Sequence, residues 1–289
     1  MPNAAHLIAI GALAALLAAC ASPPESTTAD AAQRLAAALR GRPVVLLGEV
    51  HDNAVQHALR AQALARHLAD GARPALLMEV FDRERQSEID RALAGPHADA
   101  KAAVDAVIAA GSGGTAASGW DWRFYRPYIA LAVEHRLPIV AVNVTRADAR
   151  RVAADGLAAL GFDPAVPLDL QAGQTAAIVE GHCGAIDASR ARPLVAAQAA
   201  RDQFMARAVR AHAERGVVVL AGNGHVRRDL GVARWLTPAL RDRTLAIGVL
   251  ETGSATRVPA RAYDLVIETA AQARPDPCLA FGRAAPDRP

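Results

Sequence analysis

Acid, base and metal-binding side chains follow two apolar stretches of this sequence at the same spacing. Residues 44–53 read VVLLGEVHDN, so that Glu49 and His51 come directly after four apolar residues. Residues 216–225 read GVVVLAGNGH and end in His225, again in a Gly-x-x-His pattern. A glycine permits a sharp turn out of a strand, and the histidine can then point back over the strand end. Imidazole and carboxylate groups can bind a divalent metal or act as base and acid, so both stretches are candidates for a site.

Two more apolar stretches carry polar groups at their ends. ALLMEV at 75–80 contains Glu79, and LPIVAVNV at 137–144 contains Asn143 and is followed by Arg146. If these stretches are parallel strands, their carboxyl ends lie at one edge of a sheet, where ligands bind in open α/β folds. That edge would collect four groups that could hold a divalent metal ion or a water molecule and attack an ester or amide: Glu49, His51, Glu79 and His225. The simpler alternative is that each histidine only bonds to the backbone of its own loop.

The elements that must position these groups alternate between apolar strands and helices. Strands are expected at 43–47, 75–80, 137–144, 244–250 and 262–268, with another beginning at 216. Helices are expected at 30–40, 54–69 and 122–135, and over 82–110 with a break at Gly95-Pro96. This order predicts an α/β protein with a mostly parallel central sheet flanked by helices on both faces. We expect a single domain over 41–270, a helical insertion at about 147–214 and a loosely ordered tail at 271–289.

Aromatic residues are concentrated in one short segment. Aromatics make up 4% of the chain, yet residues 120–128 (WDWRFYRPY) hold two of the three tryptophans and two of the three tyrosines. One interpretation is an aromatic wedge that packs the following helix against the sheet. The other is a porphyrin site, which needs stacking faces, a phenolate for ferric iron and guanidinium groups for propionates.

The N-terminal stretch is typical of a bacterial lipoprotein. Residues 7–20 read LIAIGALAALLAAC, an apolar run that is short for a membrane span and ends in small residues before Cys20. We expect residues 1–19 to be a signal peptide, Cys20 to carry a lipid, and residues 20–40 to form a lipid-anchored linker and a first helix. The expected location is the bacterial cell envelope, and Ala21, by resemblance to sorted lipoproteins, favours the outer membrane.

The remaining cysteines and the overall charge bear on the partners. Cys183 and Cys278 are left for the folded part of the chain, and in an oxidising compartment such a pair predicts a disulfide more readily than a metal site. The chain has 32 basic and 29 acidic residues and a net charge of +3. Because the arginines are spread along the chain and mixed with acids, we expect no nucleic-acid partner.

Several ordered motifs resemble those of ChaN-type haem-binding lipoproteins, which share a superfamily with Tiki proteases, TraB proteins and erythromycin esterases. The motifs are LGEVHDNAVQH (47–57), MEVFDRERQ (78–86), WRFYRPYIALA (122–132), LPIVAVNVTR (137–146), GHCG (181–184), QAARDQFMA (198–206) and AGNGHVRRDLGVARWL (221–236). The resemblance implies ferric haem bound at the cell envelope, with tyrosine ligation and haem shared across a homodimer.

The resemblance also implies roles for individual residues. The family's Trp-x-x-Tyr-x-Pro pattern falls on Trp122, Tyr125 and Pro127, which makes Tyr125 the first candidate for the iron ligand and Tyr128 the second. Propionates would be met by an arginine: Arg123, Arg126 or Arg146. His51 and His225 would serve as hydrogen-bond donors or as a second ligand. In hydrolytic members of the superfamily, the positions of Glu49, His51, Glu79 and His225 support hydrolysis.

Two functions of different classes follow. The first is an envelope-anchored haem-binding lipoprotein that takes part in the uptake or handling of haem and iron. The alternative is a metal-dependent hydrolase of ester or peptide bonds that uses the four acidic and imidazole groups. The resemblance favours the binding protein, whereas the residues alone would favour the hydrolase. Whether the protein is also an enzyme stays open.

Overall fold

The computed structural model describes residues 25–113, 119–254 and 258–282. The predicted signal peptide and Cys20 lie outside these residues. Within the described part, no helix is both long and apolar enough to cross a membrane.

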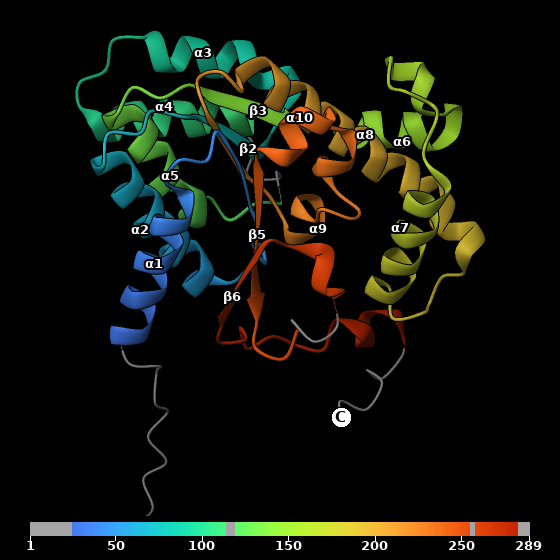
Figure 1. The fold of residues 1–289 in the computed structure, drawn as a ribbon. Coiled ribbons are helices and arrows are strands. Elements are labelled where there is room, and N and C mark those ends of the chain that lie inside the picture. Colours follow the sequence, from blue (N-terminus) through green and yellow to red (C-terminus); the bar gives the residue numbers. More distant parts are fainter. Residues whose placement is uncertain (1–24, 114–118, 255–257, 283–289) are drawn as a thin grey trace, which may run out of the picture.

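Six parallel strands form one sheet in the order β3-β2-β4-β1-β5-β6 (Figure 1). The strands are β1 (Val44–Leu47), β2 (Ala75–Asp82), β3 (Ile139–Asn143), β4 (Val217–Leu220), β5 (Thr244–Glu251) and β6 (Leu265–Thr269). Every residue of β1 and β4 is buried, as expected for strands that are covered on both faces. Val44 pairs with Val217 on one side and with Thr244 on the other, so the carboxyl ends of β1 and β4 lie level. The predicted α/β fold with a parallel sheet is confirmed.

Five helices from the first half of the chain cover one face of the sheet. They are α1 (Glu25–Leu39), α2 (Ala54–Ala69), α3 (Gln86–Ala94), α4 (Ala100–Ser112) and α5 (Trp122–Glu134). One hydrophobic core joins Leu64 of α2 and Ile129 of α5 to Leu47 and Met78 of the sheet. Asn53 caps α2 by accepting a hydrogen bond from the Gln56 backbone N–H (3.1 Å), and Asp121 caps α5 in the same way through Arg123 (3.1 Å). These caps fix where the two helices begin, next to the polar loops.

The second face is covered mainly by α8 (Ala188–His212), whose Met205 and Val209 pack against Val44 and Val219. Two further helices, α6 (Arg146–Asp155) and α7 (Leu168–Gly181), pack on α8 and lie beyond the edge of the sheet in Figure 1. The helical insertion expected at about 147–214 therefore corresponds to these three helices. Only α8 also contributes to the core of the sheet.

Two short helices were not anticipated from the sequence. The GNGH stretch forms a single helical turn, α9 (Asn223–Val226), and α10 (Pro238–Asp242) precedes β5. Both are too short to show a hydrophobic period, which is why the pattern of the sequence could not reveal them. The consequence for the site is that His225 projects from a helical turn rather than from an open loop.

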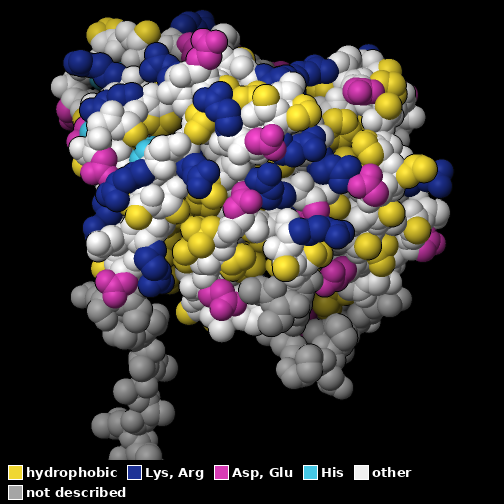
Figure 2. Space-filling view, in the orientation of Figure 1, with side chains coloured by type: hydrophobic (Ala, Val, Ile, Leu, Met, Phe, Trp, Pro, Cys, Tyr) yellow, Lys and Arg dark blue, Asp and Glu magenta, His cyan; other side chains and the backbone are white. Residues whose placement is uncertain are grey.

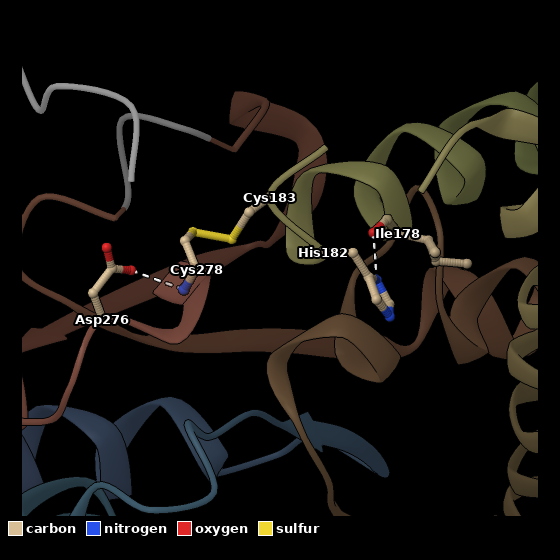
Figure 3. Close-up of a disulfide and its surroundings, with 5 residues drawn as sticks. All are labelled: Ile178, His182, Cys183, Asp276 and Cys278. Carbon is tan, nitrogen blue, oxygen red and sulfur yellow. Dashed lines mark hydrogen bonds between the residues drawn. A yellow bond between two sulfur atoms is a disulfide. The ribbon is translucent and has the colours of Figure 1, made fainter. Parts of the chain in front are cut away.

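The tail that the sequence predicts to be loosely ordered makes specific contacts as far as residue 282. Cys278 lies in a short 3₁₀ helix, η7 (Pro277–Phe281), and forms a disulfide with Cys183, which follows α7 (Figure 3). The rings of His182 and Phe281 lie 5.6 Å apart beside this bond. A composition rich in proline and arginine indicated little hydrophobic packing, but covalent and ionic contacts hold this segment instead.

Candidate functional site

The turn after β1 brings Glu49 and His51 to the carboxyl edge of the sheet. The Gly48 backbone N–H donates to the carbonyl of Ile247 (2.8 Å), which continues the pairing with β5 for one more residue. A Cβ atom on Gly48 would lie 2.2 Å from the side-chain oxygen of Asn223. Only glycine therefore permits the turn of β1 and the helical turn α9 to approach this closely.

Glu49 is the centre of a buried hydrogen-bonded cluster. The residue is 3% exposed, and its carboxylate accepts hydrogen bonds from the Tyr125 hydroxyl (2.7 Å) and from the guanidinium of Arg60. The same carboxylate lies 2.9 Å from Nδ1 of His51. Because an ionised carboxylate only accepts hydrogen bonds, Nδ1 of His51 must carry the proton. In the neutral ring, Nε2 then carries the lone pair.

His57 supports this cluster from the first turn of α2. Its ring stacks on Phe124 at 4.7 Å, and Nε2 lies 3.1 Å from the backbone carbonyl of His51. Burial lowers the pKa of His57 to about 4, so the ring is neutral at pH 7 and donates its proton to that carbonyl. His57 thus holds the backbone of His51 in place and does not itself supply a charge.

A second cluster forms around His225. Nδ1 lies 2.6 Å from Asp202 and Nε2 lies 3.3 Å from Glu79. Burial alone would lower the pKa of His225, but the flanking carboxylates of Glu79 and Asp202 raise it to about 10. Burial likewise opposes the ionisation of Glu79, yet His225 and the Gly222 N–H, which donates to Glu79 at 2.7 Å, lower its pKa to about 2. Burial raises the pKa of Asp202 above its ordinary value. At neutral pH this cluster holds an imidazolium against an ionised Glu79.

The two clusters meet at Gly222. A Cβ atom there would lie 2.9 Å from the ring of His51 and 3.7 Å from Glu79. Because Gly222 has no side chain, the His51 ring and the Glu79 carboxylate can both pack against its backbone.

A cavity of about 820 Å³ opens over both clusters. Its polar lining includes His51, Asp52, Glu79, Asp82, Asp121, Asn143, Arg146, Gln198, Arg201 and His225, and its aromatic lining consists of Trp120 and Phe124. The guanidinium of Arg146 lines the cavity and makes no ion pair or hydrogen bond within the part of the chain that the structure describes. On the face seen in Figure 2, basic and acidic side chains are interspersed.

The structure separates the predicted site residues into those at the cavity and those away from it. His51, Glu79, His225 and Arg146 line the cavity, and Glu49 lies directly behind His51. Tyr125 and Tyr128 do not line it. Tyr125 is 3% exposed and is bonded to Glu49, and Tyr128 is fully buried and donates to the carbonyl of His57 (3.0 Å).

The two arginines in the aromatic segment are also not among the residues that line the cavity. Arg123 pairs with Asp121 and Arg126 with Asp105, both at exposed positions. Burial raises the pKa of both tyrosines well above its ordinary value. In this arrangement the tyrosines are neutral hydrogen-bond donors.

The four groups proposed as a metal site divide into two pairs, Glu49 with His51 and Glu79 with His225. In residues 25–113, 119–254 and 258–282, no three His, Cys, Asp or Glu side chains are arranged to hold a metal ion. Both nitrogens of His225 already contact carboxylates, and Glu49 already accepts from Arg60 and Tyr125. These side chains do not fit a preassembled metal centre.

Sequence reasoning did not identify three residues that shape the site. Arg60 neutralises Glu49, Asp202 orients His225, and Arg201 lines the cavity. All three lie within helices, α2 or α8, where a charged residue ordinarily faces water. Of the three, only Arg201 and Asp202 could have been singled out from the sequence, because they belong to the QAARDQFMA motif.

A parallel α/β sheet with a polar cavity at the carboxyl ends of its strands defines the class of open α/β proteins whose ligands bind at that edge. Within this class, the chain belongs to the family described as "Haem-binding uptake, Tiki superfamily, ChaN", which it matches over residues 35–236. A comparison with curated proteins gave no match.

Among solved structures, the chain is similar to ChaN of Campylobacter jejuni, in a structure that shows cofacial heme binding. The identity is 17% and the TM-score 0.61, over 81% of this chain and 90% of that chain. This likeness supports the shared fold. A mutant of the erythromycin esterase EreC in its open conformation has 14% identity and a TM-score of 0.41, over 77% of this chain and 73% of that one. The type III effector HopBA1 has 16% identity and a TM-score of 0.46, over 84% and 94%.

Proposed function

We propose that this protein binds haem in the cavity at the carboxyl edge of the sheet. The observation that carries the proposal is the lining of that cavity in a member of a haem-binding family: aromatic Trp120 and Phe124 together with Arg146 and Arg201. A volume of about 820 Å³ is within the range of cofactor sites. Bound ferric haem would supply an iron with axial positions for protein ligands and two propionates for cations.

Among the proposed ligands, His51 has the geometry that best suits iron. Its Nδ1–H is directed to Glu49, which leaves the Nε2 lone pair available, and its side chain is 46% exposed at the cavity. A carboxylate behind a ligating histidine fixes the ring and raises its basicity. Tyr125, the ligand that the family resemblance implies, would first have to leave Glu49 and give up its proton. We therefore place His51 on iron and Tyr125 behind it, as a donor to Glu49.

The propionates would be met by Arg146 and Arg201, because planar guanidinium groups bind carboxylates with paired hydrogen bonds. Trp120 and Phe124 would offer apolar ring surface to the macrocycle.

We also propose that the protein is anchored in the cell envelope by a lipid on Cys20, that it takes part in haem or iron uptake, and that it forms a homodimer. Incorporation of labelled palmitate that is lost in Cys20→Ala would test the anchor.

A hemin titration of the soluble form that begins at Ala21, followed by absorbance, tests the location of the site. We expect saturable binding that weakens ~10-fold in Arg146→Ala and in Arg201→Ala, since each loses a charge-assisted hydrogen bond. Arg126→Ala is the matched control, because this arginine pairs with Asp105 outside the cavity lining. If Arg146→Ala and Arg201→Ala bound hemin as tightly as Arg126→Ala, the haem would lie elsewhere.

The second candidate function, a hydrolase, is supported by the His225 cluster at the same cavity. An imidazolium between Asp202 and Glu79 can act as an acid or stabilise a developing negative charge, whereas His51 can accept a proton. Ester hydrolysis by the wild type would be measured both with and without an added divalent metal. A rate that disappears in His51→Ala and in His225→Gln would favour this candidate. Unchanged rates in both variants would remove it.

A further inference from the structure

The chain beyond β5 contacts the loop that carries His51. Asn53, two residues after His51, donates from Nδ2 to Glu251 (2.8 Å) and to the carbonyl of Ala270 (3.0 Å). Gln56 donates to the Thr269 hydroxyl (3.0 Å) and accepts from the backbone N–H of Val50 (2.7 Å). The backbone on both sides of His51 is therefore connected to the ends of β5 and β6.

Arg274 completes this connection. Its Nε and Nη2 atoms donate to both oxygens of Asp52, at 2.9 and 2.8 Å. Its Nη1 and Nη2 atoms donate to both oxygens of Glu251, at 2.8 and 2.7 Å. Asp52 adjoins His51 and lines the cavity, whereas Glu251 is buried at the end of β5. One guanidinium thus bridges the cavity loop and the sheet.

The segment that carries Arg274 is itself fixed at both ends. At one end, Thr269 belongs to β6; at the other, Cys278 is bonded to Cys183 after α7 (Figure 3). The Asp276 carboxylate accepts from the Cys278 backbone N–H (2.9 Å) and shapes the turn between Arg274 and the disulfide. Release of Cys278 would leave residues 275–282 without their covalent connection to the α7 side of the molecule.

We propose that Arg274 is a positioning residue that holds His51 over the cavity, and that the Cys183–Cys278 disulfide keeps Arg274 in place. The His51 ring is half-exposed and is held by its bond to Glu49 and an edge contact with Trp120, so its direction depends on a fixed backbone. Its role toward haem rests on the proposed function. We call the Arg274 bridge between Asp52 and Glu251 the clamp. The family match ends at residue 236, so it covers Asp52 but not Glu251, Arg274 or Cys278.

Amide hydrogen exchange of residues 49–56 in the haem-free protein tests the clamp directly. We expect Arg274→Ala to accelerate exchange there by ~10-fold, the effect of losing charge-assisted bonds. Arg274→Lys retains the charge and should restore part of the protection. Arg234→Ala is the matched control, because Arg234 makes a comparable two-bond pair with Asp169 on another part of the surface. Unchanged exchange in Arg274→Ala, or equal acceleration in Arg234→Ala, would overturn the positioning role.

A Cys183→Ser/Cys278→Ser variant tests the second part in the same assay. We expect the exchange rate of residues 49–56 to lie between those of the wild type and of Arg274→Ala. A wild-type rate would overturn the part played by the disulfide.

A hemin titration tests whether the clamp affects the His51 ligand. Arg274→Ala should shift the Soret band, and Arg274→Lys should restore it in part. A wild-type Soret band in Arg274→Ala would refute the effect on His51. If the wild type binds no hemin, the proposed function fails while the exchange result still decides the clamp.

Discussion

His225 shows how neighbouring residues decide what a single side chain can do. Read from the sequence, it was a candidate base or metal ligand. Between Asp202 and Glu79 its pKa is raised to about 10, so at neutral pH it is a cation with both nitrogens engaged. His57, by contrast, is kept neutral because burial lowers its pKa to about 4. Two histidines of the same site therefore carry different charges at pH 7.

Replacing His225 by glutamine should destabilise the protein by about 3 kcal/mol at pH 6, because it leaves two buried carboxylates without their cation. Because the folded-state pKa of His225 is raised, its stabilising contribution is complete below 6.5 and declines as the pH rises toward about 10. The difference in unfolding free energy between wild type and variant should therefore shrink from pH 6 to pH 10. Urea unfolding across this range measures it, with His135→Gln at the end of α5 as control. A difference that stays constant with pH would show that His225 is not charged in the folded state.

Substitution of Gly222 tests whether the position of the His51 ring matters for hemin binding. Gly222→Ala would place a methyl group 2.9 Å from the His51 ring, which can move because its side chain is half-exposed. We expect little loss of thermal stability but ~10-fold weaker hemin binding, in proportion to the lost ligand contact. The control is Gly224→Ala two residues later, where an added Cβ meets nothing within 4 Å. Equal hemin affinities for the two variants would show that the placement of His51 does not matter for binding.

At the scale of elements, α8 and the C-terminal segment bring distant parts of the chain to the site. α8 packs Met205 and Val209 on the sheet and by the same packing directs Asp202 toward His225. The disulfide joins the loop between α7 and α8 to the tail across 95 residues of sequence. α8 directs Asp202 to His225, and the C-terminal segment carries Arg274, which we propose positions His51.

Removing the disulfide with Cys183→Ser/Cys278→Ser should lower the free energy of unfolding by about 2–4 kcal/mol, since the bond closes a long loop and restricts the unfolded chain. Urea denaturation of the variant and of the oxidised wild type measures this difference. Denaturation midpoints that coincide would show that the bond contributes nothing to stability.

At the scale of the whole molecule, the fold could be predicted because its signals are local and repeated. Each buried strand is an apolar run, and the carboxyl-edge rule then brings Glu49, Glu79 and His225 together without knowledge of strand order. The pairing of side chains could not be predicted in this way. Arg60 and Asp202 are charged residues within helices, and only the packing of α2 and α8 shows that they face inward. Tyr125 was predicted at the site, but its bond to Glu49 became evident only in three dimensions.

We propose above that the cavity binds haem with His51 directed at the iron. The most direct test is the absorbance spectrum of the hemin complex for the wild type, His51→Ala and Tyr125→Phe. We expect a saturable spectrum that changes in His51→Ala, whereas Tyr125→Phe should keep the spectrum of the wild type. A tyrosinate spectrum that is lost in Tyr125→Phe and kept in His51→Ala would contradict the assignment of His51, and a flat wild-type titration would contradict haem binding itself.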